Sequence, residues 1–172
     1  MKKILVIGSG GAGKSIFARR LGAILRLEVI HLDSLYWSAG WVEMPKDEWK
    51  ITVEALLKKD SWIMDGNYGG TLDLRLAASD TLIFLDIPRS ICLWRVLKRR
   101  ALYRKESRPD MADGCPERIT WQFIKWIWDY PRKRRPALLE KLKSSSHSKT
   151  IIVLRSQTKI ESFLANQRTS NN

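Results

Sequence analysis

The sequence is poor in cysteine and has no long apolar run. Cys92 and Cys115 are its 2 cysteines, and they form no C-x-x-C pair, which argues against a disulfide framework and a cysteine-bound metal. The first apolar run ends at Gly8, so it is too short for a membrane span or the core of a signal peptide. We therefore expect a cytoplasmic protein that does not enter a membrane.

Acidic residues are also scarce. The chain has 18 Asp and Glu against 31 Lys and Arg, which gives a formal net charge of +13. This excess predicts attraction to polyanions or phosphorylated ligands, and much of it lies in residues 95–108 and 132–135. Three interpretations stay open: a solvated basic face, arginines that fold over nucleotide phosphates, and a surface for nucleic acid.

The clearest motif is the stretch GSGGAGKS at residues 8–15, which fills every fixed position of the phosphate-binding pattern G-x-x-x-x-G-K-[ST]. Its glycines let backbone N–H groups converge on phosphate oxygens at the start of a helix. Lys14 can bridge the β- and γ-phosphates of ATP, and Ser15 can offer its hydroxyl to Mg²⁺. The alternative is a glycine-rich turn that only caps a helix. The predicted nucleotide-binding residues are Gly8, Ser9, Gly10, Gly11, Ala12, Gly13, Lys14 and Ser15.

The remaining pattern is a regular alternation of strands and helices. Short apolar runs predict strands within residues 2–8, 27–33, 61–67, 81–88 and 149–155. Helical spacing of apolar residues separates these runs, so the sequence predicts a three-layer α/β/α sandwich with a five-stranded parallel sheet. A chain of 172 residues is long enough for one such core, and we expect a single domain over residues 1–172.

Two predicted strands end in an acidic residue, which parallel strands would bring to the same edge of the sheet as the phosphate loop. Asp33 follows the second strand and Asp65 the third. Beside a transferring phosphate, a carboxylate can hold the metal or accept a proton from an attacking hydroxyl. We expect Asp33 to be the base and Asp65 to be the metal residue, although either could simply cap the turn that follows its strand. Asp86 stands in a similar position but precedes Pro88, which favours a role in the turn.

Several further segments match a known family, namely HLDSLYW, WIMDGNYGGTLDLRL, LIFLDIPR, CLWRVLKRR and RPDMADGCPER. Together with the phosphate loop they resemble the bacterial DNA topology modulation proteins, which look like relatives of adenylate kinase. The resemblance extends from Met1 to about Leu164. It implies a P-loop kinase fold that uses ATP and Mg²⁺, with a helical lid inserted at about residues 103–135.

The same resemblance implies roles for arginines beyond the phosphate loop. Arg95 would lie against the adenine ring and Arg99 near the triphosphate, where it would act in catalysis. The loop of residues 155–158 would lie beside the adenine and would bring Arg155 to it. The lid would close and exclude water, and one or more of its arginines would then reach back, namely Arg132, Arg134 or Arg135.

The acceptor side departs from the adenylate kinase pattern. The first arginine after Asp65 is Arg75, which is further along the chain than the arginine that holds the acceptor phosphate in adenylate kinases, so AMP is doubtful as the acceptor. HLDSLYW instead resembles the segment of shikimate- and gluconate-type kinases in which an Asp touches the acceptor hydroxyl. The substrate residues expected are Asp33, Trp37, Asp65 and Arg75. Trp37, with Tyr36 and Trp41, would form an aromatic wall for a base or sugar, unless these rings serve only in packing.

These observations predict a Mg²⁺-dependent phosphotransferase that passes the γ-phosphoryl group of ATP, or of another nucleoside triphosphate, to a small acceptor. A nucleotide is one candidate acceptor. Two alternatives stay open. The chain could be a DNA-associated protein that modulates DNA topology and has a regulatory or vestigial nucleotide site. It could also be a nucleotide-gated binding module that transfers phosphate to nothing.

Overall fold

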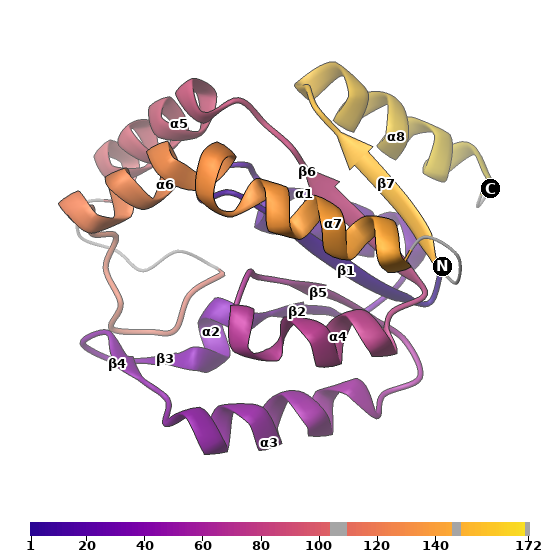
Figure 1. Cartoon of the computed structure of the whole chain (residues 1–172), viewed down its shortest axis with the longest axis horizontal. Helices are drawn as coiled ribbons and strands as arrows, with labels where there is room; N and C mark the ends of the chain where they lie inside the picture. Colours follow the sequence, from indigo (N-terminus) through magenta and orange to yellow (C-terminus); the bar gives the residue numbers. More distant parts are fainter. Residues whose placement is uncertain (104–109, 146–148, 171–172) are drawn as a thin grey trace.

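A five-stranded parallel sheet forms the centre of the fold in the computed structural model, which describes residues 1–103, 110–145 and 149–170 (Figure 1). The strands lie in the order β2-β5-β1-β6-β7, so the strand that precedes the phosphate loop is central. Residues 4–7 of that strand are at most 1% exposed, because helices cover both faces of the sheet. The predicted parallel sheet is confirmed. The strands are β1 (Lys3–Gly8), β2 (Val29–His31), β5 (Trp62–Asp65), β6 (Thr81–Leu85) and β7 (Thr150–Leu154).

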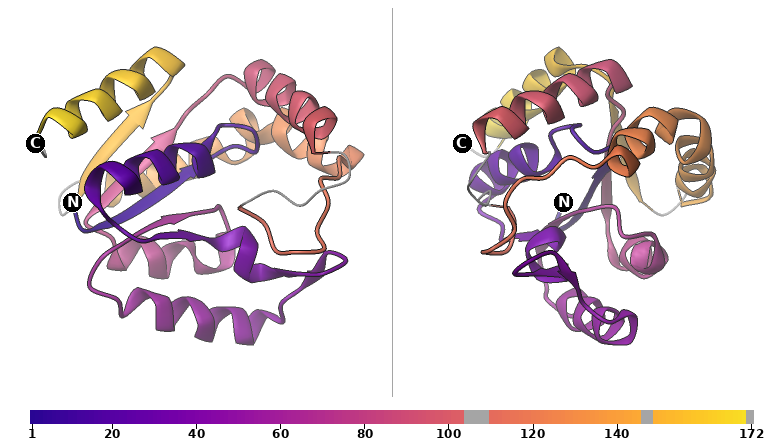
Figure 2. Two further views of the ribbon diagram at one scale, coloured as in Figure 1. Left: turned by 180° about the vertical axis from the view of Figure 1, so that it is seen from behind. Right: turned by 90° about the vertical axis from the view of Figure 1, so that its left-hand side faces the viewer.

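Helices pack on both faces of this sheet, as the predicted three-layer sandwich requires (Figure 2). Because successive side chains of a strand point to opposite faces, Ile4 and Val6 join one apolar cluster while Leu5 and Ile7 join the other. The first cluster is covered by α1 (Lys14–Leu25), α5 (Arg89–Leu102) and α8 (Gln157–Ser170). The second is covered by α3 (Lys46–Leu57), α4 (Leu72–Ala78) and α7 (Arg135–Ser145), and α6 (Trp121–Lys133) contributes to both.

The connection after β2 contains elements that the sequence pattern did not indicate. A short helix, α2 (Leu32–Tyr36), leads into a hairpin of two antiparallel strands, β3 (Trp37–Ser38) and β4 (Val42–Glu43). A 3-10 turn, η1 (Gly69–Thr71), likewise follows β5. Strands of two residues carry no readable periodicity, which explains why the hairpin was not predicted.

The region expected to form a lid is described in part, since residues 104–109 lie outside the described residues. Residues 110–120 form neither a helix nor a strand ladder and run to the hairpin, where the N–H of Gly40 donates to the carbonyl of Gly114 at 2.9 Å. Helix α6 then begins with the Oγ1 of Thr120 accepting from the N–H of Phe123 at 3.2 Å. Movement of this region as a lid stays a prediction. Within residues 1–103, 110–145 and 149–170, no helix has the length and apolarity needed to cross a membrane.

Candidate functional site

The phosphate loop joins β1 to α1 at the carboxyl edge of the sheet. Gly11 and Gly13 have φ of 78° and 93°, in the left-handed region that L side chains rarely adopt. A Cβ on Gly11 would also lie 2.3 Å from the carbonyl oxygen of Cys92 in α5. The loop therefore needs glycine at position 11 both for its backbone conformation and for its close approach to α5.

Lys14 folds back onto the loop. Its Nζ donates to the carbonyls of Gly8 and Ser9, each at 3.1 Å. Burial lowers the pKa of Lys14, while the charges of Asp33 and Asp65 act in the opposite direction. No acidic side chain lies in the first turn of α1, so nothing there neutralises the partial positive charge of its N-terminus. The loop thus concentrates positive charge where phosphates would lie.

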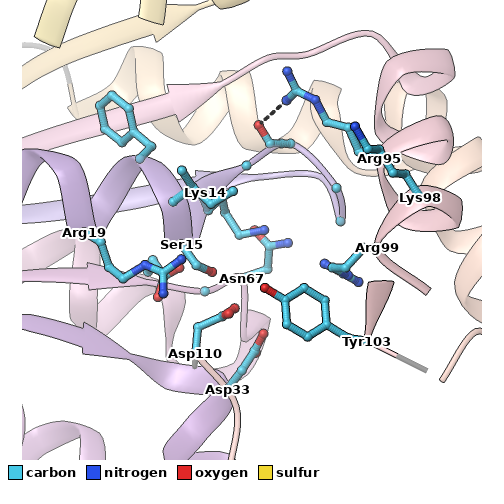
Figure 3. Close-up of a pocket in the computed structure, with 18 of the residues that line it drawn as sticks. Lys14, Ser15, Arg19, Asp33, Asn67, Arg95, Lys98, Arg99, Tyr103 and Asp110 are labelled. Carbon is cyan, nitrogen blue, oxygen red and sulfur yellow. Dashed lines mark hydrogen bonds between the residues drawn. The ribbon is translucent and has the colours of Figure 1, made fainter. Parts of the chain in front are cut away.

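A cavity of about 800 Å³ opens in front of this loop (Figure 3). Figure 3 shows Arg95, Lys98 and Arg99 of α5 on one side, and Asp33 and Asp110 on another. The cavity brings together most of the predicted site residues, namely Gly10, Gly11, Ala12, Gly13, Lys14, Ser15, Asp33, Trp37, Asp65, Arg95 and Arg99. Gly8 and Ser9 are buried at the base of the loop and do not line the cavity.

The acidic side of the cavity is held by hydrogen bonds from neighbouring rings. Asp33 accepts from the hydroxyl of Tyr68 at 2.7 Å, and burial together with the charge of Asp33 raises the pKa of Tyr68, which keeps that donor protonated. Asp65 is 4% exposed, and its Oδ1 lies 2.8 Å from Nδ1 of His31. Burial alone would lower the pKa of His31, but the hydrogen bond and charge of Asp65 outweigh it and raise that pKa.

Ser15 and Asp65 both line the cavity. Among the described residues, no group of three or more His, Cys, Asp or Glu side chains could hold a metal on its own. Mg²⁺ in phosphoryl-transfer sites keeps several waters and takes its other ligands from one or two side chains and the substrate phosphates. One hydroxyl and one carboxylate fit Mg²⁺ that arrives with a nucleotide, and they do not fit a resident metal cage.

Arginines of α5 reach the cavity from the side opposite to Asp33. Arg95 donates through Nη1 to the carbonyl of Ala12 at 3.1 Å and through Nη2 to Oε1 of Gln157 at 2.9 Å. Arg95 is thereby fixed against the phosphate loop. Arg99 bonds to the carboxylate of Glu117, which is 3% exposed.

The other predicted arginines lie elsewhere, and none of them lines the cavity. Arg135 pairs with Asp86 at 2.8 Å. Arg155, which like Arg95 was expected at the adenine, bonds to the same carboxylate at 3.4 Å. Arg134 stacks on Trp126 with 5.2 Å between guanidinium and ring centroid, and Arg132 is exposed on α6. Asp86, which directly follows β6, therefore binds two arginines. In this conformation, Arg132, Arg134, Arg135 and Arg155 do not face the phosphate loop.

Arg75 also differs from its expected place at the acceptor. Its side chain is 0% exposed and points beneath the loop that follows β5. The guanidinium donates to backbone carbonyls of that loop, including Gly66 at 2.9 Å and Tyr68 at 2.8 Å. The position of Arg75 on α4 turns it into the core, so in this structure it supports the loop and does not reach the cavity.

The aromatic residues after β2 were expected either to form a wall of the substrate site or to serve only in packing, and the structure shows both kinds. Trp37 lines the cavity, whereas Tyr36 and Trp41 do not. The ring of Tyr36 packs 5.2 Å from Trp37, 5.1 Å from Trp49 and 4.7 Å from Tyr68, measured between centroids. Tyr36 thus belongs to an aromatic cluster that supports the wall, and Trp37 belongs to the wall itself.

Other cavity residues were not predicted. Arg19 comes four residues after Ser15 and so lies on the same face of α1, a signal that the sequence does contain. Asp110, which is 6% exposed, belongs to the segment RPDMADGCPER, which carried the resemblance but assigned this carboxylate no role. The unpredicted polar or aromatic residues at the cavity include Arg19, Asn67, Tyr68, Trp94, Lys98, Tyr103 and Asp110. Gln157, which also lines the cavity, belongs to the loop of residues 155–158 that was expected beside the adenine.

The fold is similar to that of small-molecule kinases of known structure. A shikimate kinase from Acinetobacter baumannii in complex with shikimate gives a TM-score of 0.58 at 14% identity, covering 96% of this chain and 90% of that one. A gluconokinase from Sinorhizobium meliloti 1021 gives 0.53 at 12% identity, covering 98% and 94%. A shikimate kinase from Bacteroides thetaiotaomicron gives 0.51 at 16% identity, covering 97% and 96%. Identities this low show a shared fold and leave the activity and the substrate open.

No protein-family model matches the chain, and no curated protein matches its sequence. The resemblance to DNA topology modulation proteins therefore gains no support from the comparisons. The same holds for a DNA-associated function and for a nucleic-acid surface. The part of the resemblance that is supported is the overall fold.

Proposed function

We propose that this protein is a phosphotransferase that uses ATP and Mg²⁺ to phosphorylate a hydroxyl group of a small molecule. The observation that carries the proposal is the arrangement of one cavity, in which the phosphate loop with Lys14 and the carboxylate of Asp33 both face the same space. A donor triphosphate and an acceptor hydroxyl would meet there. The similarity of the fold to that of shikimate kinases and a gluconokinase supports this class of reaction.

In the proposed reaction, the acceptor oxygen bonds to the γ-phosphorus as the bond from that phosphorus to the β,γ-bridging oxygen breaks. ADP leaves with the electron pair of the broken bond, and the hydroxyl proton passes to Asp33. Lys14 and Arg99 would stabilise the charge on the phosphoryl oxygens. Mg²⁺, brought with ATP and held by Ser15 and Asp65, would neutralise charge on the β- and γ-phosphates.

The base of ATP would lie toward α5 and the loop after β7. Arg95 and Gln157 are bonded to each other at 2.9 Å there, and both line the cavity. Arg95 would offer the flat face of its guanidinium to the adenine. Arg155, which is bound to Asp86 in this structure, would have to turn away from that carboxylate to reach the nucleotide.

The acceptor would lie between Asp33 and the ring of Trp37. A flat ring gives a sugar or a base a large contact area, and Asp33 would orient one hydroxyl toward the γ-phosphate. The shikimate complex of the Acinetobacter baumannii enzyme shows that a kinase of this fold takes a small hydroxylated acid. We infer an acceptor of similar size for this chain.

The test is to incubate the protein with ATP, Mg²⁺ and pools of small hydroxylated metabolites. ATP consumption and the mass gain of one phosphoryl group on an acceptor would be measured. Lys14→Ala should lower phosphoryl transfer by about 100-fold or more without changing the melting temperature much, since Lys14 acts on developing charge. Lys50→Ala, on the exposed face of α3, is the control and should transfer normally.

Equal turnover by the Lys14→Ala variant and the unaltered protein would refute the proposal. Tight ATP binding without any phosphorylated product across the pools would instead favour a nucleotide-gated binding module. The two outcomes are distinguishable, because the first is a kinetic result on a variant and the second is a property of the unaltered protein.

A further inference from the structure

The segment of residues 66–68 touches the cavity and the phosphate loop together. Its central residue, Asn67, lines the cavity and directs its amide at Gly8, the last residue of β1. Nδ2 of Asn67 donates to the Gly8 carbonyl at 2.8 Å, and Oδ1 accepts from the Gly8 N–H at 3.3 Å. Because one bond needs a donor and the other an acceptor, the pair defines the orientation of the amide. Asn67 thus binds both polar groups of the residue at which the phosphate loop begins.

The Gly8 carbonyl has a second donor, Lys14, whose Nζ lies 3.1 Å away. The ammonium group of Lys14 has three donors, so it can turn all of them to phosphate oxygens only if it leaves the Gly8 and Ser9 carbonyls. A buried carbonyl that loses its only partner is unfavourable, because nothing then compensates its loss of water. Asn67 keeps the Gly8 carbonyl bonded in both situations, which removes part of that cost when Lys14 turns to a nucleotide.

The shape of the 66–68 segment depends on a buried cation. Arg75, at 0% exposure, donates to the carbonyls of Gly66, Asn67 and Tyr68 at 2.8–2.9 Å and to Oγ1 of Thr71 at 3.3 Å. In the parts of the chain that the structure describes, no carboxylate pairs with it. Burial lowers the pKa of Arg75 to about 10, so the side chain stays charged at neutral pH. Three successive carbonyl dipoles therefore stabilise the charge, and they hold that geometry only while Arg75 is there.

The far end of the segment is also anchored. The hydroxyl of Tyr68 donates to Asp33 at 2.7 Å, and its ring packs 4.7 Å from Tyr36 and 5.0 Å from Trp49, between centroids. Held at Tyr68 and by Arg75, the backbone of residues 66–68 has little freedom, and the amide of Asn67 is presented to Gly8 in one position.

We propose that Arg75 is a positioning residue for nucleotide binding, which acts through Asn67 on Gly8 of the phosphate loop. The inference rests on the proposed function only in that ATP is taken as the ligand of the loop. Arg75 touches neither the nucleotide nor the acceptor in this scheme. Its hydrogen bonds fix the backbone of residues 66–68, and Asn67, held in that position, bonds to Gly8 at the start of the phosphate loop.

The probe is a non-hydrolysable ATP analogue with Mg²⁺, titrated calorimetrically at a temperature where every variant is folded. Asn67→Leu, which keeps the volume but removes both hydrogen bonds, should weaken analogue binding about five- to tenfold. Arg75→Met should weaken it to a similar extent. The double variant should bind no more weakly than either single variant, because both changes break the same connection. Asn166→Leu, the same substitution at an exposed position of α8, should bind like the unaltered protein.

A merely structural Arg75 would lower the melting temperature and leave the affinity of the folded protein unchanged. That result would overturn the inference, and so would multiplicative losses in the double variant or normal binding by Asn67→Leu. If Arg75→Met does not fold, Arg75→Lys replaces it in the cycle, because a lysine keeps the charge but cannot span three carbonyls. Failure of the unaltered protein to bind the analogue would refute the proposed function instead.

Discussion

Arg99 of α5 donates twice to the same oxygen of Glu117, from Nε at 3.0 Å and from Nη2 at 2.7 Å. The carboxylate is 3% exposed, whereas Arg99 lines the cavity in front of the phosphate loop. The arginine expected at the triphosphate is thus held by an internal anion, which phosphate oxygens would have to replace or share. Negative charge this close to the cavity also opposes a triphosphate through its Coulomb field.

We therefore expect Glu117→Gln to bind a Mg²⁺-bound ATP analogue about three- to tenfold more tightly, because the change removes one negative charge beside Arg99. The variant should also melt at a lower temperature, since Arg99 loses a charge-assisted bond. Calorimetric titration at low and high salt measures the first effect, and the gain should shrink as salt rises. Glu54→Gln, exposed on α3, is the control. Weaker binding by Glu117→Gln would contradict the prediction and show that Glu117 aims Arg99 at the nucleotide.

Gly11 offers a test of the phosphate loop that does not depend on the reaction. Its φ is 78°, and a Cβ would lie 2.3 Å from the backbone carbonyl oxygen of Cys92, which has little room to shift. Gly11→Ala should lower the free energy of unfolding by about 2 kcal/mol or more and should also weaken analogue binding. Denaturant unfolding measures the first effect. Gly70→Ala is the matched control, because a Cβ there meets nothing within 4 Å, and a loss of similar size at Gly70 would contradict the explanation.

The parts of the fold that could be predicted are those with a strong local signal. The apolar run at residues 4–7 is buried on both faces, as a central parallel strand must be, and the glycines of the phosphate loop have the conformations that their pattern requires. The hairpin of β3 and β4 was missed because it has two residues per strand. The hairpin also bonds to Gly114 and Pro116, which are distant in the sequence, so its surroundings could not be predicted from local pattern.

The site was less predictable than the fold, and the arginines show why. The sequence shows that Arg75 is the first arginine after Asp65, but it does not show which way the first residues of α4 face. The pairing of Arg135 and Arg155 with Asp86 depends on packing between elements that are 49 and 69 residues from that carboxylate. A long flexible cation has many partners within reach, so its partner follows from tertiary structure and not from a motif.

The hydrogen bonds of Asp80 let us predict how the free energy of unfolding depends on pH. Its Oδ2 accepts from the backbone N–H groups of Lys2 at 2.7 Å and Lys3 at 2.9 Å, and its Oδ1 accepts from Thr81 Oγ1 at 2.6 Å. Burial acts to raise the pKa of Asp80, but these hydrogen bonds outweigh it and lower the pKa below its ordinary value of 3.8. The stabilisation is therefore present above the unfolded pKa and is lost as the pH falls through the folded one.

Asp80→Ala should cost about 1 kcal/mol of unfolding free energy at pH 7, after allowing for solvent screening of an exposed carboxylate. The difference between variant and unaltered protein should shrink as the pH falls below about 4, because the carboxylate is then increasingly protonated in both states. Chemical denaturation at several pH values measures this. Asp60→Ala, the same substitution at an exposed position, is the control and should change the free energy of unfolding little at pH 7. A difference that stays constant down to pH 2 would contradict the role of ionised Asp80.

Trp41 connects the hairpin to the segment expected to act as part of a lid. Its Nε1 donates to the carbonyl of Pro116 at 3.1 Å, and the Arg118 guanidinium lies 4.7 Å from the centroid of its ring. The φ of Trp41 is 65°, an uncommon value for a bulky residue, which local contacts must compensate. The ring also stands edge-on to that of Trp37, 5.3 Å away between centroids, so Trp41 contacts a residue that lines the cavity.

Trp41→Ala should loosen residues 111–118 while leaving the sheet intact. Amide hydrogen exchange measured by mass spectrometry should be about tenfold faster in that segment and unchanged in β1 and β6, because only local opening is affected. Trp121→Ala removes a ring that is 75% exposed and should leave exchange in the segment unchanged. Unaltered exchange in Trp41→Ala would mean that the backbone bond between Gly40 and Gly114 holds the segment without the indole. In that case the positive φ of Trp41 would need another explanation, because neither contact of its ring would then compensate the strain.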